Sequence, residues 1–267
     1  MIDKSFVKKS FNTGAATYDD NAALQRRLLD SLLDFAECAC LQPRRVLDIG
    51  IGTGNLSERL ARMFPSAKVD GCDLAENMLA RARLKCAPET LRLFVADAEA
   101  LPLGAGCFDL AASSFTLQWL NSLDRALRET LRILLPGGMF FFSVFGARTF
   151  HELRECFYHA CSETGYDQGE ALVLPHTREG TDQALRVAGF DTVTTGHLQV
   201  TEYYGSVADL VRAIKGMGAR NASSRRNRTP GVRRIWRRMV ELYEIRYGRE
   251  GRIPATYEII MGRAVRP

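Results

Sequence analysis

The run VLDIGIGTG at residues 46–54 constrains the fold more than any other part of this chain. The apolar residues before the glycines predict a buried parallel strand, and the residues from Leu56 onwards predict a helix. The three glycines between them, Gly50, Gly52 and Gly54, predict a tight turn in which a ligand can approach the backbone closely. The run therefore favours a nucleotide-type binding site. A strand-turn-helix unit with purely structural glycines is the alternative.

The spacing of the glycines separates two classes of nucleotide cofactor. Dinucleotide-binding turns follow the pattern G-x-G-x-x-G, whereas here the third glycine comes one residue early and Asn55 takes the expected place. Asp48, just before the turn, would repel a pyrophosphate but attract the ammonium and sulfonium groups of S-adenosylmethionine. Asp73 ends a second apolar run and suits the two hydroxyls of a ribose, because a carboxylate only accepts hydrogen bonds. S-adenosylmethionine is therefore the predicted cofactor.

Two further apolar runs place polar residues at the same edge of the predicted sheet. Residues 91–98 predict a third strand that leads to Asp97, and residues 108–115 predict a fourth. Ligands of open parallel sheets bind beyond the carboxyl ends of the strands, so these strand ends are expected to converge. Asp97 or the Ala98 amide is expected to reach an adenine edge, whereas Asp97 as a helix cap and Trp119 as plain core are the alternatives. The predicted cofactor contacts are Asp48, Gly50, Gly52, Gly54, Asp73, Leu74, Asp97, Ala98, Phe115 and Gln118.

Alternating strands and helices run through the rest of the chain. After a helix over residues 20–37, they predict an α/β fold with a doubly wound, mostly parallel, seven-stranded Rossmann-like sheet. A helical insertion at about 206–248 delays the last strand and is expected to act as a lid. The predicted strands cover residues 46–49, 67–73, 91–98, 108–115, 139–145, 193–203 and 256–261. We expect a single domain over residues 1–267, made of a helical cap at 1–40, a cofactor-binding core at 41–165 and a substrate half at 166–267.

The cysteines and the apolar runs bear on compartment and metal content. The seven cysteines are odd in number and mostly fall in apolar helices and strands, which suits a reducing cytoplasm. Cys156, His159 and Cys161 share one predicted helix, but their spacing turns them to different faces, so we expect packing residues and no metal site. No signal peptide and no run of transmembrane length is seen. The expectation is a cytoplasmic protein.

The net charge of +5 is concentrated in one segment. Between residues 212 and 238, ten of 27 residues are Lys or Arg and none is acidic, which leaves the other 240 residues at −5. The second half of this segment predicts a helix with Ile235, Trp236 and Met239 on its inner stripe and arginines on its solvent face. The segment favours an acidic partner, either a protein or a nucleic acid, and a solvated charged face is the alternative.

These motifs together resemble the class I S-adenosylmethionine-dependent methyltransferases. The resemblance spans about residues 44–145 and rests on the glycine turn, Asp73, the run DAEALP at 97–102 and the run L-x-x-L-x-P-G-G at 131–138. A narrower resemblance, to the malonyl-acyl carrier protein O-methyltransferases of biotin biosynthesis, covers most of the chain. It rests on Phe11-Asn12, Ala15-Ala16, Tyr18, Ala22, Gln25, Leu117-Gln118-Trp119, Phe142-Ser143 and Arg212-x-x-Lys215-x-x-Gly218-Ala219-x-Asn221.

The narrower resemblance implies methylation of the free carboxylate of a malonyl thioester on acyl carrier protein, which starts pimeloyl synthesis. Such a carboxylate is already ionised at pH 7, so no general base is needed and positioning in a dry pocket suffices. We expect Tyr18, Trp119 and Phe11 to close that pocket and Arg148 to pair with the substrate, since a buried anion needs a partner. Pure packing by Tyr18 and a surface role for Arg148 are the alternatives. Because the carrier is acidic, basic residues are expected to bind it. The expected substrate and carrier contacts are Phe11, Arg212, Lys215, Arg225, Arg226, Arg228, Arg233, Arg234 and Arg237.

Three other functions stay open at this point. The same fold could methylate another small acid or a quinone precursor, because fold does not fix substrate. An RNA methyltransferase would use the arginines on phosphates, although the basic segment has few aromatic residues for base stacking and Trp236 is expected to face inward. A cofactor-sensing interaction protein would keep the pocket without turnover.

Overall fold

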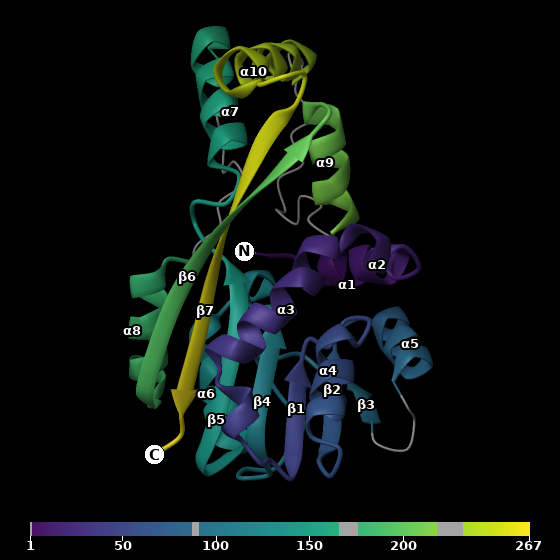
Figure 1. Ribbon diagram of the computed structural model, residues 1–267, viewed down its shortest axis with the longest axis vertical. Helices are drawn as coiled ribbons and strands as arrows, with labels where there is room; N and C mark the ends of the chain where they lie inside the picture. The colour runs from purple at the N-terminus through teal and green to yellow at the C-terminus, as the bar shows by residue number, and fades with distance from the viewer. Residues whose placement is uncertain (1, 87–90, 166–175, 218–231) are drawn as a thin grey trace.

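One sheet of seven strands forms the centre of the molecule (Figure 1). The computed structural model describes residues 2–86, 91–165, 176–217 and 232–267. In chain order the strands are β1 (Arg45–Ile49), β2 (Lys68–Asp73), β3 (Leu91–Val95), β4 (Phe108–Ser114), β5 (Leu134–Phe145), β6 (Asp191–Tyr204) and β7 (Ile253–Val265).

The strand order confirms the predicted sheet. The strands lie in the order β3-β2-β1-β4-β5-β7-β6. The first five pair in parallel, and β7 runs antiparallel to both of its neighbours, β5 and β6. The carboxyl ends of β1 to β5 therefore meet at one edge. Strands β2 and β3 are added on one side of β1 and strand β4 on the other, and ligands of such sheets bind at this switch in strand order.

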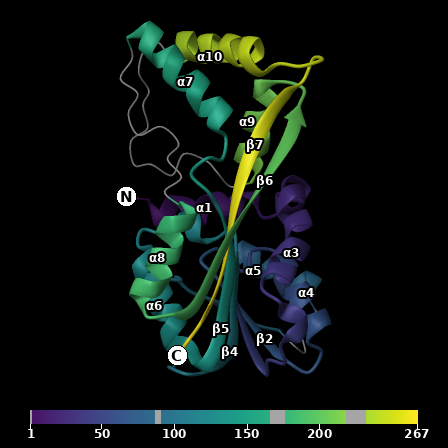
Figure 2. The same ribbon diagram turned by 60° about the vertical axis from the view of Figure 1, so that its left-hand side comes forward.

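Helices cover both faces of this sheet because alternate strand residues point to opposite sides. Figure 2 shows α6 and α8 on one side and α3 and α4 on the other. Val46 accordingly packs in the core with Leu32 and Leu60, whereas its neighbour Leu47 packs with Leu127. The helices are α1 (Lys4–Gly14), α2 (Tyr18–Asn21), α3 (Ala23–Phe35), η1 (Cys38–Cys40), α4 (Asn55–Met63), α5 (Glu76–Lys85), η2 (Leu117–Trp119), α6 (Leu123–Ile133), α7 (His151–Thr164), α8 (Arg178–Ala188), α9 (Val207–Gly216) and α10 (Val232–Tyr247). Of the helices described, none is both long and apolar enough to cross a membrane.

Strands β6 and β7 continue past the edge of the sheet. β7 pairs with β5 from Ile259 to Val265, whereas its first residues, from Ile253 to Glu258, pair with β6. This two-stranded ribbon rises beyond the carboxyl ends of β1 to β5 and carries α7, α9 and α10 around it (Figure 1). The described part of the insertion between the last two strands consists of the helices α9 and α10, as predicted, and lies beyond the carboxyl ends of β1 to β5.

The inner face of α10 differs from the prediction. Ile235 and Met239 are buried as expected, but Trp236 is 40% exposed and Leu242 takes its place in the core. The sequence of α10 contains two overlapping apolar stripes, and the neighbouring helix decides between them: α10 packs on α7, where the Arg238 guanidinium pairs with the Glu163 carboxylate. The expectation that Trp236 faces inward is wrong.

Three local boundaries also differ from the prediction. The helix expected over residues 20–37 is split at Ala22 into α2 and α3. A separate helix, α1, precedes them, and the Asp3 carboxylate caps it by accepting from the Ser5 and Phe6 amides. Strand β5 begins at Leu134, before the proline-glycine run, because Gly138 has no Cβ to collide with the Leu135 carbonyl oxygen, which would lie only 2.8 Å away.

Candidate active site

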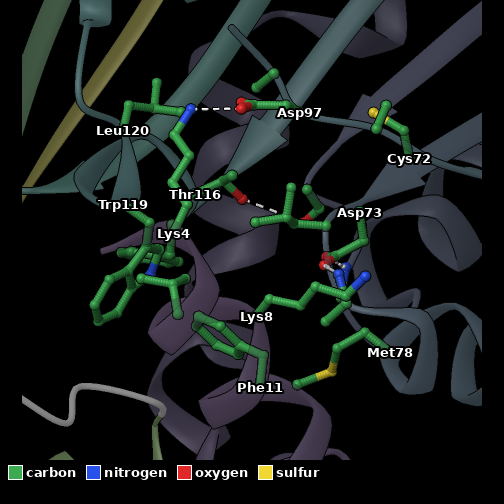
Figure 3. A pocket seen from close by; sticks show the side chains of 18 of the residues that line it. Lys4, Lys8, Phe11, Cys72, Asp73, Met78, Asp97, Thr116, Trp119 and Leu120 are labelled. Atoms are coloured by element: carbon green, nitrogen blue, oxygen red, sulfur yellow. Dashed lines mark hydrogen bonds and ion pairs between the residues drawn. The ribbon is translucent and has the colours of Figure 1, made fainter. Parts of the chain in front are cut away.

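A cavity opens at the carboxyl ends of β1 to β4, under the N-terminal helices (Figure 3). From the sheet side it is lined by Gly50, Gly52, Cys72, Asp73, Leu74, Ala75, Met78, Ala96, Asp97, Ala98, Ser114, Phe115, Thr116, Trp119 and Leu120. Helices α1 and α2 add Lys4, Val7, Lys8, Phe11 and Tyr18. A second cavity shares Tyr18, Gly50, Gly52, Ser114 and Phe115 with the first, so the two form adjoining lobes of one site.

The three predicted glycines have different roles in the turn. All have positive φ, at 73° for Gly50, 55° for Gly52 and 88° for Gly54. A Cβ on Gly50 would lie 2.2 Å from Thr116 Oγ1, so this glycine lets the turn approach the end of β4. A Cβ on Gly52 would meet nothing within 4 Å, which leaves its backbone open to a ligand in either lobe. Gly54 is the N-cap of α4 and is not among the residues that line either lobe.

Asp73 has the acceptor geometry that a ribose requires. Its Oδ2 accepts from the Gly52 amide at 2.9 Å, and its Oδ1 accepts from the Ala75 amide at 2.8 Å. Burial raises the pKa of this carboxyl, although its backbone hydrogen bonds, led by the one from the Ala75 amide, partly offset that effect. A carboxylate offers about four lone-pair positions, so two remain free for a pair of hydroxyl donors. Asp73 therefore fixes the glycine turn and still faces the cavity.

Asp48 lines the second lobe from the end of β1. It is only 1% exposed, and its Oδ2 accepts from Ser57 Oγ at 2.8 Å. Burial raises the pKa of Asp48 to about 7, with a smaller contribution from the negative charge of Asp73. A buried carboxyl of this kind is poised to take up a cation, because a positive ligand restores the ionised form that burial disfavours.

Sequence reasoning missed two polar residues of this lobe. Gln25 and Arg26, on consecutive positions of α3, line it together with Asp48 and Thr53. Gln25 is 7% exposed, and its Oε1 is buried without a hydrogen-bond partner among the described residues. Arg26 is exposed. The lobe thus offers an acceptor and a cation to a ligand that carries both an ammonium and a carboxylate.

Aromatic side chains from distant parts of the chain form one wall of the first lobe. The Phe11 ring lies edge-on to Trp119 at a centroid distance of 5.4 Å and 6.2 Å from the Tyr18 ring. Figure 3 shows Phe11 and Trp119 side by side at the pocket. Burial, with the charges of Asp73 and Asp19, raises the pKa of Tyr18, so its hydroxyl remains a proton donor at neutral pH. Tyr18 lines both lobes, so this wall borders their junction.

Asp97 and Ala98 line the first lobe as predicted, with a partner that the sequence did not reveal. The Asp97 Oδ2 accepts from Lys4 Nζ at 2.5 Å, and Lys4 also pairs with Glu99 at 2.7 Å (Figure 3). The pair joins α1 to the loop after β3 across 93 positions of sequence. A capping aspartate at position 3 is the signal that could have placed Lys4 on a helix.

Only some of the residues predicted to contact the cofactor from the segment after β4 line the cavity. Phe115 lines both lobes with φ at 54°, a left-handed conformation that is costly for a non-glycine residue and that ends β4 at the cavity. Leu74 also lines the first lobe. Gln118 is not among the lining residues, and its Oε1 is buried without a hydrogen-bond partner in the described part of the chain. Arg148 is exposed and outside the lining. Its amide donates to a Glu258 carboxylate oxygen at 2.8 Å, and its carbonyl accepts from the His151 amide at 3.2 Å.

The predicted basic contacts lie away from the cavity, on α9 and α10. Lys215, Arg233, Arg234 and Arg237 are exposed, and their side chains have no acidic partner among the described residues. Arg212 pairs with Asp209 at 2.5 Å on the same helix. The remaining predicted contacts, Arg225, Arg226 and Arg228, lie outside the described residues.

Comparisons with known proteins bear on the family and the fold. The family model described as "Methyltransferase domain" matches residues 47–142, which hold the glycine turn and the ends of β1 to β4. Among solved structures, YcgJ of Bacillus subtilis aligns with a TM-score of 0.62 at 18% identity, covering 90% of this chain and 98% of that one. The phosphoethanolamine N-methyltransferase 2 of Haemonchus contortus in complex with S-adenosyl-L-methionine aligns with a TM-score of 0.60 at 19% identity, covering 96% of this chain and 57% of that one. At these identities the two structures support the fold.

Curated relatives match almost the whole chain. The malonyl-[acyl-carrier protein] O-methyltransferase of Geobacter sulfurreducens is 40% identical over 266 residues, covering 98% of both chains. The enzyme of the same name from Laribacter hongkongensis is 37% identical, covering 99% of this chain and 90% of its own. The match includes the N-terminal helices and the insertion as well as the cofactor half. The chain therefore belongs to the malonyl-[acyl-carrier protein] O-methyltransferase family.

Proposed function

We propose that this enzyme transfers a methyl group from S-adenosylmethionine to the free carboxylate of a malonyl group carried as a thioester on acyl carrier protein. The product is the malonyl methyl ester, which the sequence resemblance assigns to the start of pimeloyl synthesis for biotin. The observation that carries the proposal is the full-length similarity to relatives named for this substrate. The two-lobed cavity supports it, because the protein would hold the cofactor there and leave the aromatic wall for the acyl group.

The residues of both lobes fit S-adenosylmethionine. Asp73 has two acceptor positions free for the ribose hydroxyls, and the open backbone at Gly52 allows close contact. In the second lobe, Asp48 and the unpaired Gln25 Oε1 suit the ammonium of the methionine part, and Arg26 suits its carboxylate. When bound, this cofactor supplies an electrophilic methyl group on a sulfonium.

The protein's part in the reaction is to position the substrate and exclude water. A malonyl carboxylate has a pKa of roughly 3 to 4 and is ionised at neutral pH, so no side chain has to remove a proton. The reaction joins an anion to a cation, and its transition state carries less charge than the reactants, so a dry pocket favours it. Phe11 and Trp119 supply the apolar wall, and the Tyr18 hydroxyl supplies a donor at the junction of the lobes.

Replacing Tyr18 with phenylalanine should lower kcat/KM for the malonyl carrier by about 10- to 100-fold, the usual cost of one hydrogen bond to a charged group. The ring and its contact with Phe11 would remain, so folding and binding of S-adenosylhomocysteine should change little. Steady-state kinetics with a radiolabelled methyl donor measures the first, and calorimetry measures the second. Kinetics equal to the wild type would leave Tyr18 with a packing role only.

Cofactor affinity should depend on pH through Asp48. Burial raises the pKa of Asp48 to about 7, and only its ionised form attracts an ammonium. The ligand must therefore displace a proton at low pH, so the affinity should rise by about tenfold between pH 6 and pH 8 and then level off. Calorimetry with S-adenosylhomocysteine across this range measures the trend, and Asp48→Asn should abolish it. A pH-independent affinity in the wild type would show that the ammonium does not contact Asp48.

The outer face of α10 suits an acidic carrier protein. Arg233, Arg234 and Arg237 are exposed without acidic partners among the described residues, and Trp236 lies between them in sequence with 40% of its surface exposed. An aromatic residue among arginines can contact an apolar spot on the partner while the cations pair with its carboxylates. Arg238 is different, because Glu163 and Glu241 already pair with it. We therefore place the carrier on the exposed face of α10.

Methyl transfer from labelled S-adenosylmethionine to malonyl-acyl carrier protein tests the proposal directly. Malonyl-coenzyme A, acetyl-acyl carrier protein and bulk tRNA serve as parallel acceptors. Base-labile label on the malonyl carrier and none on the acetyl carrier would support carboxyl methylation. The exposed Trp236 gives the RNA alternative a base-stacking residue, so label found only on tRNA would replace the proposal with that function. Cofactor binding without turnover on any acceptor would favour a sensing role.

A further inference from the structure

The Asp19 carboxylate lies at the centre of a polar cluster beside the cofactor lobes. Its Oδ1 accepts from Thr53 Oγ1 at 2.6 Å and from Asn55 Nδ2 at 3.0 Å, and its Oδ2 accepts from Lys85 Nζ at 2.7 Å. Lys85 also donates to Asn55 Oδ1 at 2.7 Å. Every member of the cluster thus contacts at least two others.

The cluster joins three segments that surround the cavity. Asp19 is on α2, directly after Tyr18, whereas Thr53 and Asn55 belong to the glycine turn and the start of α4. Lys85 is the last residue of α5, the helix that follows Asp73. The cluster therefore ties the substrate-side tyrosine to both structures that hold the cofactor.

Helix α2 depends on such contacts for its position. It has four residues and no side-chain cap at its N-terminus, and a single isolated turn of helix is unstable in water. Its residues are half-buried or exposed, and Tyr18 packs against the small cluster of Ala15, Ala75 and Met78. Gly216 of α9 packs near Asn21, which gives α2 a second neighbour, but that contact is at the opposite end from Tyr18. The charged tie at Asp19 adds directed hydrogen bonds to this packing at the start of the helix.

The Asp19 carboxyl of this cluster is ionised at neutral pH. Burial opposes ionisation of Asp19, but the hydrogen bonds from Lys85, Thr53 and Asn55, with the charge of Lys85, outweigh it and lower the pKa of this carboxyl. The side chains of Asp19 and Lys85 are 34% and 24% exposed, so solvent screens the attraction between them only partly. An ionised, half-buried pair with shared hydrogen bonds holds its partners more rigidly than an exposed one.

We propose that Asp19 is a positioning residue that couples the cofactor-bound glycine turn to the placement of Tyr18. A cofactor bound to the turn then restrains α2 through this cluster, so the tyrosine is held more firmly in its reactive position when the cofactor is present. This inference rests on the role of Tyr18 in the proposed function. Asp20, the next residue, is exposed with no side-chain partner among the described residues, so Asp20→Asn is a matched control on the same helix.

Hydrogen exchange measured with and without S-adenosylhomocysteine tests this coupling without turnover. In the wild type and in Asp20→Asn, the ligand should protect amides of residues 15–22 as well as those of the glycine turn. In Asp19→Asn the protection of 15–22 should be lost while that of the turn persists. Lys85→Met, which removes the cation and keeps the apolar stem, should give the same pattern and provides a second variant if Asp19→Asn is unstable. Ligand-induced protection of 15–22 in both variants would overturn the proposal.

Kinetics then separates positioning from general stability. Asp19→Asn should lower kcat by about tenfold with a smaller effect on KM for S-adenosylmethionine, and the same substitution in a Tyr18→Phe background should cost almost nothing further. Losses that multiply in the double variant would mean that Asp19 does not act through the tyrosine. A wild-type enzyme that binds S-adenosylhomocysteine but never methylates the malonyl carrier would refute the proposed function and leave the exchange result as it stands.

Discussion

Asp73→Ala is expected to weaken binding of S-adenosylhomocysteine by about 100-fold or more. Two ribose hydroxyls would each lose a charge-assisted hydrogen bond, and each such bond contributes roughly 1.5 to 3 kcal/mol. The substitution also removes the acceptors of the Gly52 and Ala75 amides, which lie at 2.9 and 2.8 Å from the carboxylate. The glycine turn then loses its fixed position at the cavity. Calorimetric titration at pH 8, where Asp48 is mostly ionised, gives the affinity without contribution from that residue's titration.

A second buried aspartate on the same strand provides the control. Asp70 is 5% exposed and pairs with Arg45 and Arg92, away from the residues that line the cavity. Asp70→Ala should lower the free energy of unfolding, because it leaves two arginines without their partner, yet leave the ligand affinity close to the wild-type value. An affinity of Asp73→Ala within about threefold of the wild type would contradict the ribose assignment, since a lost charged hydrogen bond costs more than that.

The sheet and its ligand edge could be predicted because their signals are local. Strand β1 is buried on both faces, with Val46 on one side and Leu47 on the other. The sequence of such a strand is a continuous apolar run. The carboxylates Asp48, Asp73 and Asp97 each follow or end one of these runs. Parallel pairing then brings them to one edge whatever the rest of the chain does. For this reason the sequence predicts that these three carboxylates lie at one edge of the sheet, where the structure places them.

The remaining site residues depend on contacts between distant segments. Gln25 and Arg26 look like ordinary positions of an amphipathic helix, and only the packing of α3 on the sheet brings them to the second lobe. Lys4 reaches Asp97 for the same reason. The face of α10 could not be decided from its own sequence, since Trp236 and Leu242 fit two competing apolar stripes and α7 selects the second. Periodicity identifies a helix but not the neighbour against which it packs.

Reversing the charge of Arg233, Arg234 and Arg237 together to glutamate should raise KM for malonyl-acyl carrier protein by about 10- to 100-fold. Each reversal replaces a screened attraction to an acidic partner with a repulsion, and rim charges act mainly on the association rate and its salt dependence. KM for malonyl-coenzyme A should change much less, because the malonyl group enters a cavity that these residues do not line. Raising the ionic strength should weaken the wild-type reaction with the carrier and improve that of the variant, because salt screens the attraction in the first and the repulsion in the second.

The control reverses the same amount of charge on another surface. Arg81, Arg83 and Arg125 are exposed on α5 and α6, and their replacement by glutamate changes the net charge equally without touching α10. If KM depends on long-range attraction of the carrier to the whole enzyme, both triple variants should show the same rise in KM. If α10 is the docking face, only the α10 variant should show it. Trp236→Ala in the wild-type background tests the apolar contact of α10 with the carrier, which does not depend on charge. Loss of this contact should raise KM for the carrier at high as well as low salt. Equal effects of the α10 reversal on the carrier and coenzyme A substrates would show that the carrier docks elsewhere.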